Sequence, residues 1–234
     1  MQTHRWWMAL FAPLLGCAHY ELVDTLEATS APTDVVVLLH GLGRSATSMT
    51  PMADCLSKVG YRTVRWDYPS SAFPVEAHSA ELQSLLLDLD ARPDVAQIHL
   101  VTHSLGGIVV RHALGEADVP SLGRVVMLAP PNQGSPVAER LSPMLDGVLV
   151  PLPQLSEQPE NLVHVLPMPS AVAFGVIAGA RDDKVPPAYT HLDGEADHVV
   201  VDSGHTLIMR RDDVCAHTRS FLASGRFLTD PGAP

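Results

Sequence analysis

Short apolar runs alternate along the chain with longer segments in which apolar residues recur every three or four positions. The run at residues 35–39, VVVLL, is apolar throughout, which is typical of a strand buried on both faces of a parallel sheet. A second strand is expected at residues 61–66, where polar and apolar residues alternate, and further strands at residues 98–102, 125–129, 174–178 and 198–201. The pattern predicts a sheet of about six strands, most of them parallel.

Segments with helical spacing fill the gaps between these runs. Within residues 75–90 the apolar side chains of Leu82, Leu86 and Leu89 recur at the spacing of one helix face. Further helices are expected at residues 48–59, 108–114 and 212–224. Because strands that alternate with helices form βαβ units, we predict an α/β fold with helices on both faces of the sheet.

Residues 130–170 interrupt the alternation. Proline, which lacks a backbone donor and disfavours long helices, recurs throughout this stretch. We expect an irregular excursion with one short helix near residues 137–141. It should lie over the carboxyl ends of the strands, where α/β proteins bind ligands.

The first 17 residues carry an export signal pattern. His4 and Arg5 precede a short apolar run that is well below the roughly 20 residues needed to span a bilayer. The segment Leu14-Leu15-Gly16-Cys17 resembles the lipobox of bacterial lipoproteins, which implies cleavage before Cys17 and lipid attachment to it.

These patterns divide the chain into four parts. We expect a signal peptide at residues 1–16, a tether at 17–34, the folded domain at 35–226 and a tail at 227–234. The protein would then be lipid-anchored in the cell envelope, or alternatively secreted or periplasmic, and would contact a membrane only through that anchor.

The charge of the chain excludes one class of partner. With 15 Lys and Arg against 26 Asp and Glu, the formal net charge is −11. Nucleic-acid binding requires clustered basic residues, and no such cluster occurs. We therefore expect no nucleic-acid partner and attribute the acidity to solubility.

Thr102-His103-Ser104-Leu105-Gly106 lies between a predicted strand and a predicted helix. It follows the nucleophile pattern G-x-S-x-G, except that Thr102 stands in place of the first glycine. Small residues flank the serine because strand and helix approach closely there. This context favours a nucleophilic Ser104 over a serine that only caps a helix.

A serine hydroxyl needs a general base, and a histidine after the last strand of such a fold can supply it. His205 has that position. We expect His103 and His112 to be structural and His40 to order the loop that follows it. Asp182 and Asp183 follow the strand at 174–178, and the residues alone leave open which of them orients His205.

The negative oxygen of a tetrahedral intermediate needs two backbone donors. The N–H of Leu105, directly after the serine, is one candidate. The N–H of Leu42 is the other, because Gly41 and Gly43 on either side leave its backbone free to turn inward.

Four stretches together resemble the bacterial lipase/esterase branch of the α/β-hydrolase superfamily: VVLLHGLGRSATSM, VTHSLGGIVVR, VVMLAPPNQGSPVAERL and ADHVVVDSGHTLIM. The resemblance implies a compact α/β-hydrolase fold and cleavage of carboxylic esters without a cofactor. The acid of such hydrolases lies in a G-x-x-D-x-x-V pattern, which here implies Asp182 rather than Asp183.

The expected reaction is attack of Ser104 on an ester, with His205 moving protons and Asp182 orienting it. The substrate would be a small-molecule or lipid ester. An acyltransferase and a non-catalytic binding module of the same fold are the alternatives. We expect a shallow, open cleft because the excursion cannot build a large helical cap. Candidate acyl contacts are Leu42, Val148, Leu149, Val150, Leu152 and Leu155, although they could equally pack the excursion on the sheet.

Two further groups of residues could bind a metal or form a disulfide. His191, Asp193, His198 and Asp202 match no firm ligand spacing, so we expect no metal site. Cys55 and Cys215 could remain free and buried, or could pair in an oxidising compartment. The resemblance implies proximity, because the first and last helices of this fold share one face of the sheet. Free thiols are the expected state.

Overall fold

The structure is a computed structural model of the 234-residue chain, and it describes residues 19–116, 118–167 and 172–229. The expected signal peptide and Cys17 lie outside the described residues. Among the helices of the described ranges, none is long and apolar enough to cross a membrane.

Within the described residues, seven strands form one sheet in the order β1-β3-β2-β4-β5-β6-β7. Their bounds are β1 (Glu21–Leu22), β2 (Thr33–Leu39), β3 (Arg62–Asp67), β4 (Val95–His103), β5 (Leu122–Leu128), β6 (Phe174–Gly179) and β7 (Asp197–Val201). All neighbouring pairs from β3 to β7 are parallel. The α/β prediction is confirmed, and each of the six predicted strands is present.

The additional strand, β1, pairs antiparallel with β3 at the edge of the sheet. Asp24 then accepts three hydrogen bonds from Arg65 of β3, one from its backbone N–H at 2.8 Å and two from its guanidinium group at 2.9 and 2.6 Å. The described part of the expected tether therefore packs on the domain, and β2 begins before the expected boundary at residue 35. A strand of two residues shows no periodicity, so the sequence pattern could not reveal it.

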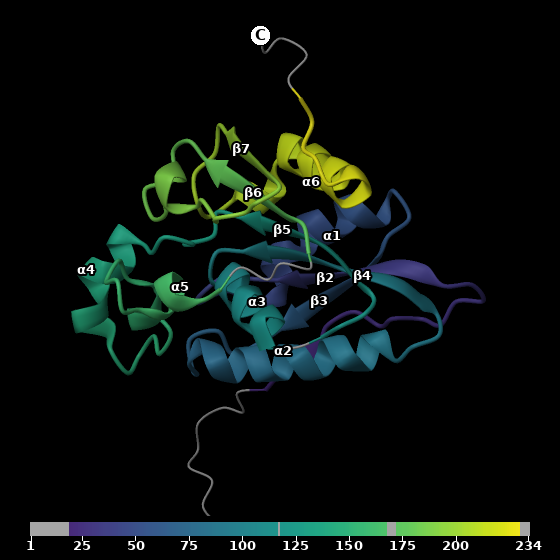
Figure 1. The fold of residues 1–234 in the computed structure, drawn as a ribbon, viewed down its shortest axis with the longest axis horizontal. Coiled ribbons are helices and arrows are strands. Elements are labelled where there is room, and N and C mark those ends of the chain that lie inside the picture. Colours follow the sequence, from purple (N-terminus) through teal and green to yellow (C-terminus); the bar gives the residue numbers. More distant parts are fainter. Residues whose placement is uncertain (1–18, 117, 168–171, 230–234) are drawn as a thin grey trace, which may run out of the picture.

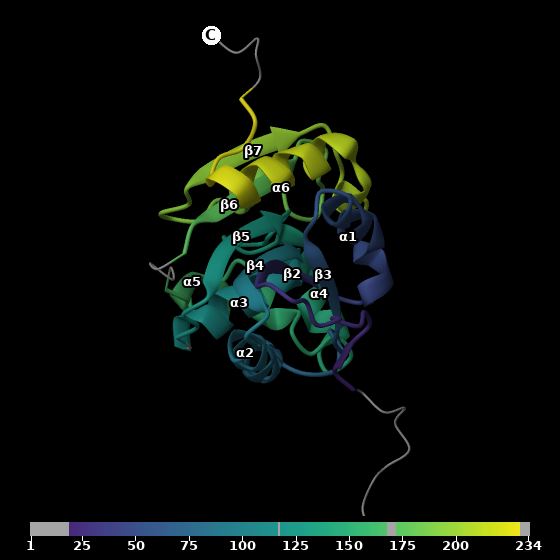
Figure 2. The ribbon, with the colours of Figure 1, turned by 90° about the vertical axis from the view of Figure 1, so that its right-hand side faces the viewer.

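Helices cover both faces of the sheet, as Figures 1 and 2 show. They are α1 (Thr50–Ser57), α2 (Val75–Asp90), α3 (Leu105–Glu116), α4 (Pro136–Leu145), α5 (Leu162–Val165) and α6 (Asp212–Ser224), with short 3₁₀ turns at Ala46–Met49, Pro153–Leu155, Pro187–Tyr189 and Ile208–Arg210. α2 and α3 pack on one face, and α1 and α6 pack on the other.

The unbroken apolar pattern of β2 follows from this double cover. Val37 and Leu39 face the core beneath α2 and α3, whereas Val36 and Leu38 face α1 and α6. All four side chains are completely buried, so no polar residue is tolerated on either side of the strand.

Two segments differ from expectation near the predicted nucleophile and in the excursion. The helix expected at residues 108–114 begins earlier, at Leu105, with two glycines in its first turn. In the excursion, α4 is longer than predicted and contains Pro143; its N-terminus is capped by Ser135, whose side chain accepts from the Ala138 N–H. Favourable capping and packing outweigh the local propensities there.

A disulfide joins Cys55 of α1 to Cys215 of α6, with 6.3 Å between the Cα atoms. The implied proximity of the two helices is confirmed, but the expectation of free thiols is wrong. The rotational setting of each helix on the sheet decides whether two cysteines meet, and the sequence pattern does not specify it.

Candidate active site

Ser104 sits at the junction between β4 and α3 with a backbone φ of 52°, a conformation that is unusual for a residue other than glycine. Two hydrogen bonds hold it there: its N–H donates to the Leu128 carbonyl at 2.9 Å, and its carbonyl accepts from the Gly107 N–H at 2.9 Å. Hydrogen bonds to β5 and to the start of α3 thus stabilise the strained backbone conformation of Ser104.

Close approach explains the small residues of this junction. A Cβ atom on Gly106 would lie 2.9 Å from the His40 carbonyl oxygen, so no residue with a side chain fits at this position of the first turn of α3. A Cβ on Gly107 would lie 3.4 Å from Thr102 Oγ1. The closer neighbour of that Cβ would be Pro130 Cβ at 3.2 Å, so the space beside Gly107 is limited as well.

The structure brings Ser104, His205 and Asp182 together although they are far apart in sequence. His205 Nε2 lies 3.0 Å from Ser104 Oγ, and His205 Nδ1 lies 2.7 Å from Asp182 Oδ2. All three residues are buried. We assign Nδ1–H as the donor to the carboxylate, which leaves Nε2 free to accept the serine proton.

The two adjacent aspartates have different environments. Asp182 Oδ1 accepts from the backbone N–H groups of Lys184 and Val185 at 2.9 and 2.8 Å, so both carboxylate oxygens are engaged. Asp183 is exposed. The geometry supports Asp182, the residue that the family pattern implied.

The two expected oxyanion donors are both free. Within the described residues, neither the Leu42 N–H nor the Leu105 N–H has a hydrogen-bond partner. The loop at Leu42 is held beside them, because the Gly43 N–H donates to Ser70 Oγ at 3.0 Å. A Cβ on Gly41 would lie 3.1 Å from the Ser104 Cβ, which explains why glycine precedes Leu42.

Two buried histidines hydrogen-bond to the backbone of residues that lie close to Ser104. His40 Nδ1 lies 2.9 Å from the Gly41 carbonyl, which agrees with the expected ordering of the loop. His103 Nε2 lies 3.0 Å from the His205 carbonyl. Burial lowers the pKa of His103 to about 3, with smaller contributions from His205 and Arg44, so its neutral ring donates to that carbonyl and holds the His205 backbone.

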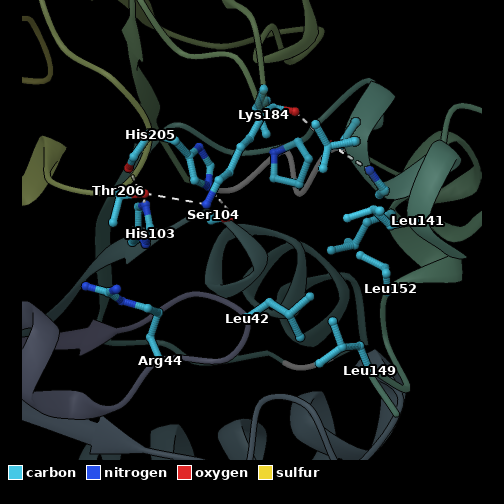
Figure 3. A pocket seen from close by; sticks show the side chains of 16 residues that line it. Leu42, Arg44, His103, Ser104, Leu141, Leu149, Leu152, Lys184, His205 and Thr206 are labelled. Carbon is cyan, nitrogen blue, oxygen red and sulfur yellow. Dashed lines mark hydrogen bonds between the residues drawn. The ribbon is translucent and has the colours of Figure 1, made fainter. Parts of the chain in front are cut away.

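A cavity of about 240 Å³ opens beside Ser104. Figure 3 shows Ser104, His205 and Thr206 at one end and Leu141, Leu149 and Leu152 at the other. Of the expected acyl contacts, Leu42, Leu149, Leu152 and Leu155 line it. Leu152 and Leu155 are buried, so the leucine end of the cavity is formed by side chains with little exposure to solvent.

The remaining acyl candidates do not line the cavity. Val148 is 67% exposed, and the Val150 N–H donates to the Ser71 carbonyl at 3.0 Å. Leu141, Arg44 and Lys184 also line the cavity, although the sequence pattern predicted none of them there. Their proximity to Ser104 depends on loops whose paths no periodic pattern describes.

A second cluster lies outside this cavity. His191, Glu195 and His198 have potential ligand atoms within 4.8 Å of one another. The cluster includes Glu195, which the sequence pattern did not indicate, and it does not include Asp193 or Asp202. His191 Nδ1 lies 2.8 Å from Glu195 Oε1, and His198 Nε2 lies 2.9 Å from Thr190 Oγ1. The first bond joins two members of the cluster, and the second ties His198 to a residue outside it.

Solved structures with a similar fold include several bacterial lipases and esterases. The propeptide form of the lipase BlEst2 from Bacillus licheniformis superposes with a TM-score of 0.74 at 17% identity, over 92% of this chain and 56% of that one. The present chain thus spans little more than half of that form. The mature form gives a TM-score of 0.68 at 18% identity, over 90% and 99% of the two chains.

A thermophilic esterase from Thermogutta terrifontis gives a TM-score of 0.59 at 16% identity, over 89% of this chain and 93% of that one. At such identities the likeness concerns the fold. No curated protein matches the sequence. A family model described as the Alpha/beta hydrolase family matches residues 36–164, more than half of the chain. The chain therefore belongs to the alpha/beta hydrolase family.

Proposed function

We propose that the protein hydrolyses carboxylic esters through an acyl-enzyme on Ser104. The observation that carries this proposal is the hydrogen-bonded series Asp182, His205 and Ser104, with distances of 2.7 and 3.0 Å, beside a largely apolar cavity. The fold likeness to structures of lipases and esterases supports the reaction class without specifying the substrate.

In the first half of the reaction, Ser104 Oγ forms a bond to the ester carbonyl carbon as its proton passes to His205 Nε2. Asp182 stabilises the resulting imidazolium through Nδ1–H. The tetrahedral intermediate then collapses, the bond to the alkoxy oxygen breaks, and His205 gives its proton to the departing alcohol.

In the second half, water takes the place of the alcohol. His205 removes one proton from the water as its oxygen bonds to the acyl carbon, and it returns that proton to Ser104 Oγ as the carboxylic acid leaves. In both tetrahedral intermediates the Leu42 and Leu105 N–H groups would donate to the negative oxygen.

We propose further that the protein is exported to the cell envelope with a lipid on Cys17. The Cys55–Cys215 disulfide supports export, because such bonds persist in oxidising compartments. Mass spectrometry of the mature N-terminus tests the anchor: a lipid-modified Cys17 is expected, and an unmodified Cys17 or a different first residue would contradict it.

The reaction is tested with p-nitrophenyl esters and a fluorophosphonate probe. We expect hydrolysis of the esters and stoichiometric labelling of Ser104, located by peptide mass spectrometry. Adding an alcohol acceptor tests acyl transfer, which should remain a minor product. Absence of both turnover and labelling in the folded protein would contradict the proposal and favour a binding module.

A further inference from the structure

The cavity beside Ser104 differs in charge from the rest of the molecule. The chain has 26 Asp and Glu against 15 Lys and Arg. Among the described residues that line the cavity, Arg44 and Lys184 are cationic and none is Asp or Glu. The net charge of −11 repels anions from the protein as a whole. Two cations beside the cavity would instead attract an anion locally.

Neither cation is neutralised by a neighbour. In the described part of the chain, no carboxylate forms an ion pair with Arg44 or Lys184, although five other arginines do pair with aspartates. One of these pairs, Arg181 with Asp202, lies close to Lys184 in sequence. Five arginines are thus paired, whereas Arg44 and Lys184 are among the described cations that form no ion pair, and both of them line the cavity.

Lys184 is built into the site by its backbone. Its N–H donates to Asp182 Oδ1 at 2.9 Å, and its carbonyl accepts from Ser135 Oγ at 2.7 Å. Its ammonium group lies 3.5 Å from Thr206 Oγ1, next to His205. The aspartate that orients His205 thus also fixes the backbone from which the Lys184 side chain extends.

The position of these cations indicates which part of an ester would meet them. His205 Nε2 must reach the departing alkoxy oxygen to protonate it, so the alcohol portion has to lie toward His205 and Thr206. Figure 3 shows Arg44 and Thr206 on the His205 side of Ser104, with the Lys184 side chain directed there, and the leucines on the opposite side. The acyl chain would occupy the leucine end.

We propose that the preferred substrates are esters with an apolar acyl chain and an alcohol portion that carries a carboxylate or phosphate, bound by Arg44 and Lys184. This inference rests on the proposed ester hydrolysis. Both cations are exposed, so their attraction is screened by salt and weaker than that of a buried pair.

The test compares two esters that differ only in charge: 3-butyryloxypropanoate and its neutral primary amide. We expect the ratio of their kcat/KM values to favour the anion about fivefold at low salt, a size typical of exposed ion pairs. The ratio should fall toward one in Lys184→Gln and in Arg44→Gln, whereas Lys184→Arg should retain it. A second anion, 1-butyrylglycerol 3-phosphate against 1-butyrylglycerol, distinguishes phosphate from carboxylate.

Lys58→Gln and Arg140→Gln are the matched controls. Both side chains are exposed and lie outside the cavity, and each substitution removes one positive charge. They should leave the ratio unchanged. Two results would overturn this inference alone, provided that both esters are hydrolysed. One is a preference for the amide, and the other is a ratio that stays unchanged in Lys184→Gln and Arg44→Gln. Failure to hydrolyse either ester, with no labelling of Ser104, would remove the proposed function and the inference with it.

Discussion

The edge of the sheet that carries Ser104, Asp182 and His205 is built differently from the excursion that lies beside it. The three side chains follow the ends of β4, β6 and β7, and all are buried. The described part of the excursion, residues 130–167, consists of short helices and turns, and its Met144, Val148 and Val165 are 77%, 67% and 62% exposed. Figure 1 shows α4 and α5 at one side of the molecule.

The difference separates two tasks. Parallel strands hold the side chains of Ser104, Asp182 and His205 in one geometry, while the leucines of the excursion form the wall that an acyl chain would contact in the proposed reaction. Changes at the sheet edge should therefore affect every ester alike, whereas changes in the excursion should depend on the length of the acyl chain.

The largest effect is expected at the edge. Ser104→Ala removes the nucleophile, and kcat should fall by roughly 10⁴-fold or more for all esters, with only binding and oxyanion stabilisation left. The thermal unfolding midpoint should stay close to that of the parent. Substantial turnover by a folded variant would contradict the assignment.

Asp182→Asn and Asp183→Asn form a matched pair at the same edge. The first should lower kcat by about 10⁴-fold, because the amide no longer holds His205 in the tautomer that accepts the serine proton. The second should have little effect, since Asp183 is exposed and outside the hydrogen-bonded series. Equal losses measured side by side would reject the choice of Asp182.

Removing the Cys55–Cys215 disulfide tests whether the fold can be destabilised without changing the cavity beside Ser104. Replacing Cys55 and Cys215 together by alanine should lower the free energy of unfolding by about 2–4 kcal/mol, because the link no longer restricts the unfolded chain. Denaturant titration measures this. The acyl-length profile of the folded variant should match the parent, and a shifted profile would show that α1 and α6 also shape the cavity.

The smallest effect is expected in the excursion. Leu141→Ala should leave acetate esters almost unaffected and lower kcat/KM for longer acyl esters by a few fold, since each buried methylene contributes about 0.8 kcal/mol. Met144→Ala, in the same helix but 77% exposed, is the control. An equal loss at every acyl length would place Leu141 with the rigid edge and end the distinction.

Much of the fold could be predicted from local patterns. The apolar runs predicted six of the strands, and the predicted helix at residues 75–90 coincides with α2. The strand–turn–helix context also predicted Ser104 and His205, because the ends of parallel strands meet at one edge of a sheet. The choice of Asp182 over Asp183 came from the family pattern, and the structure supports it with three hydrogen bonds.

The sequence by itself determined the set of elements and their order. Burial of one face of a strand or helix imposes a regular spacing of apolar residues, and that spacing is visible in the sequence. Only the tertiary structure decided that β1 adds to the sheet, that Cys55 meets Cys215, and that Leu141 and Lys184 line the cavity beside Ser104. These contacts depend on the rotation of helices and the paths of loops. Those are set by close packing between distant segments, which leaves no repeating mark in the sequence.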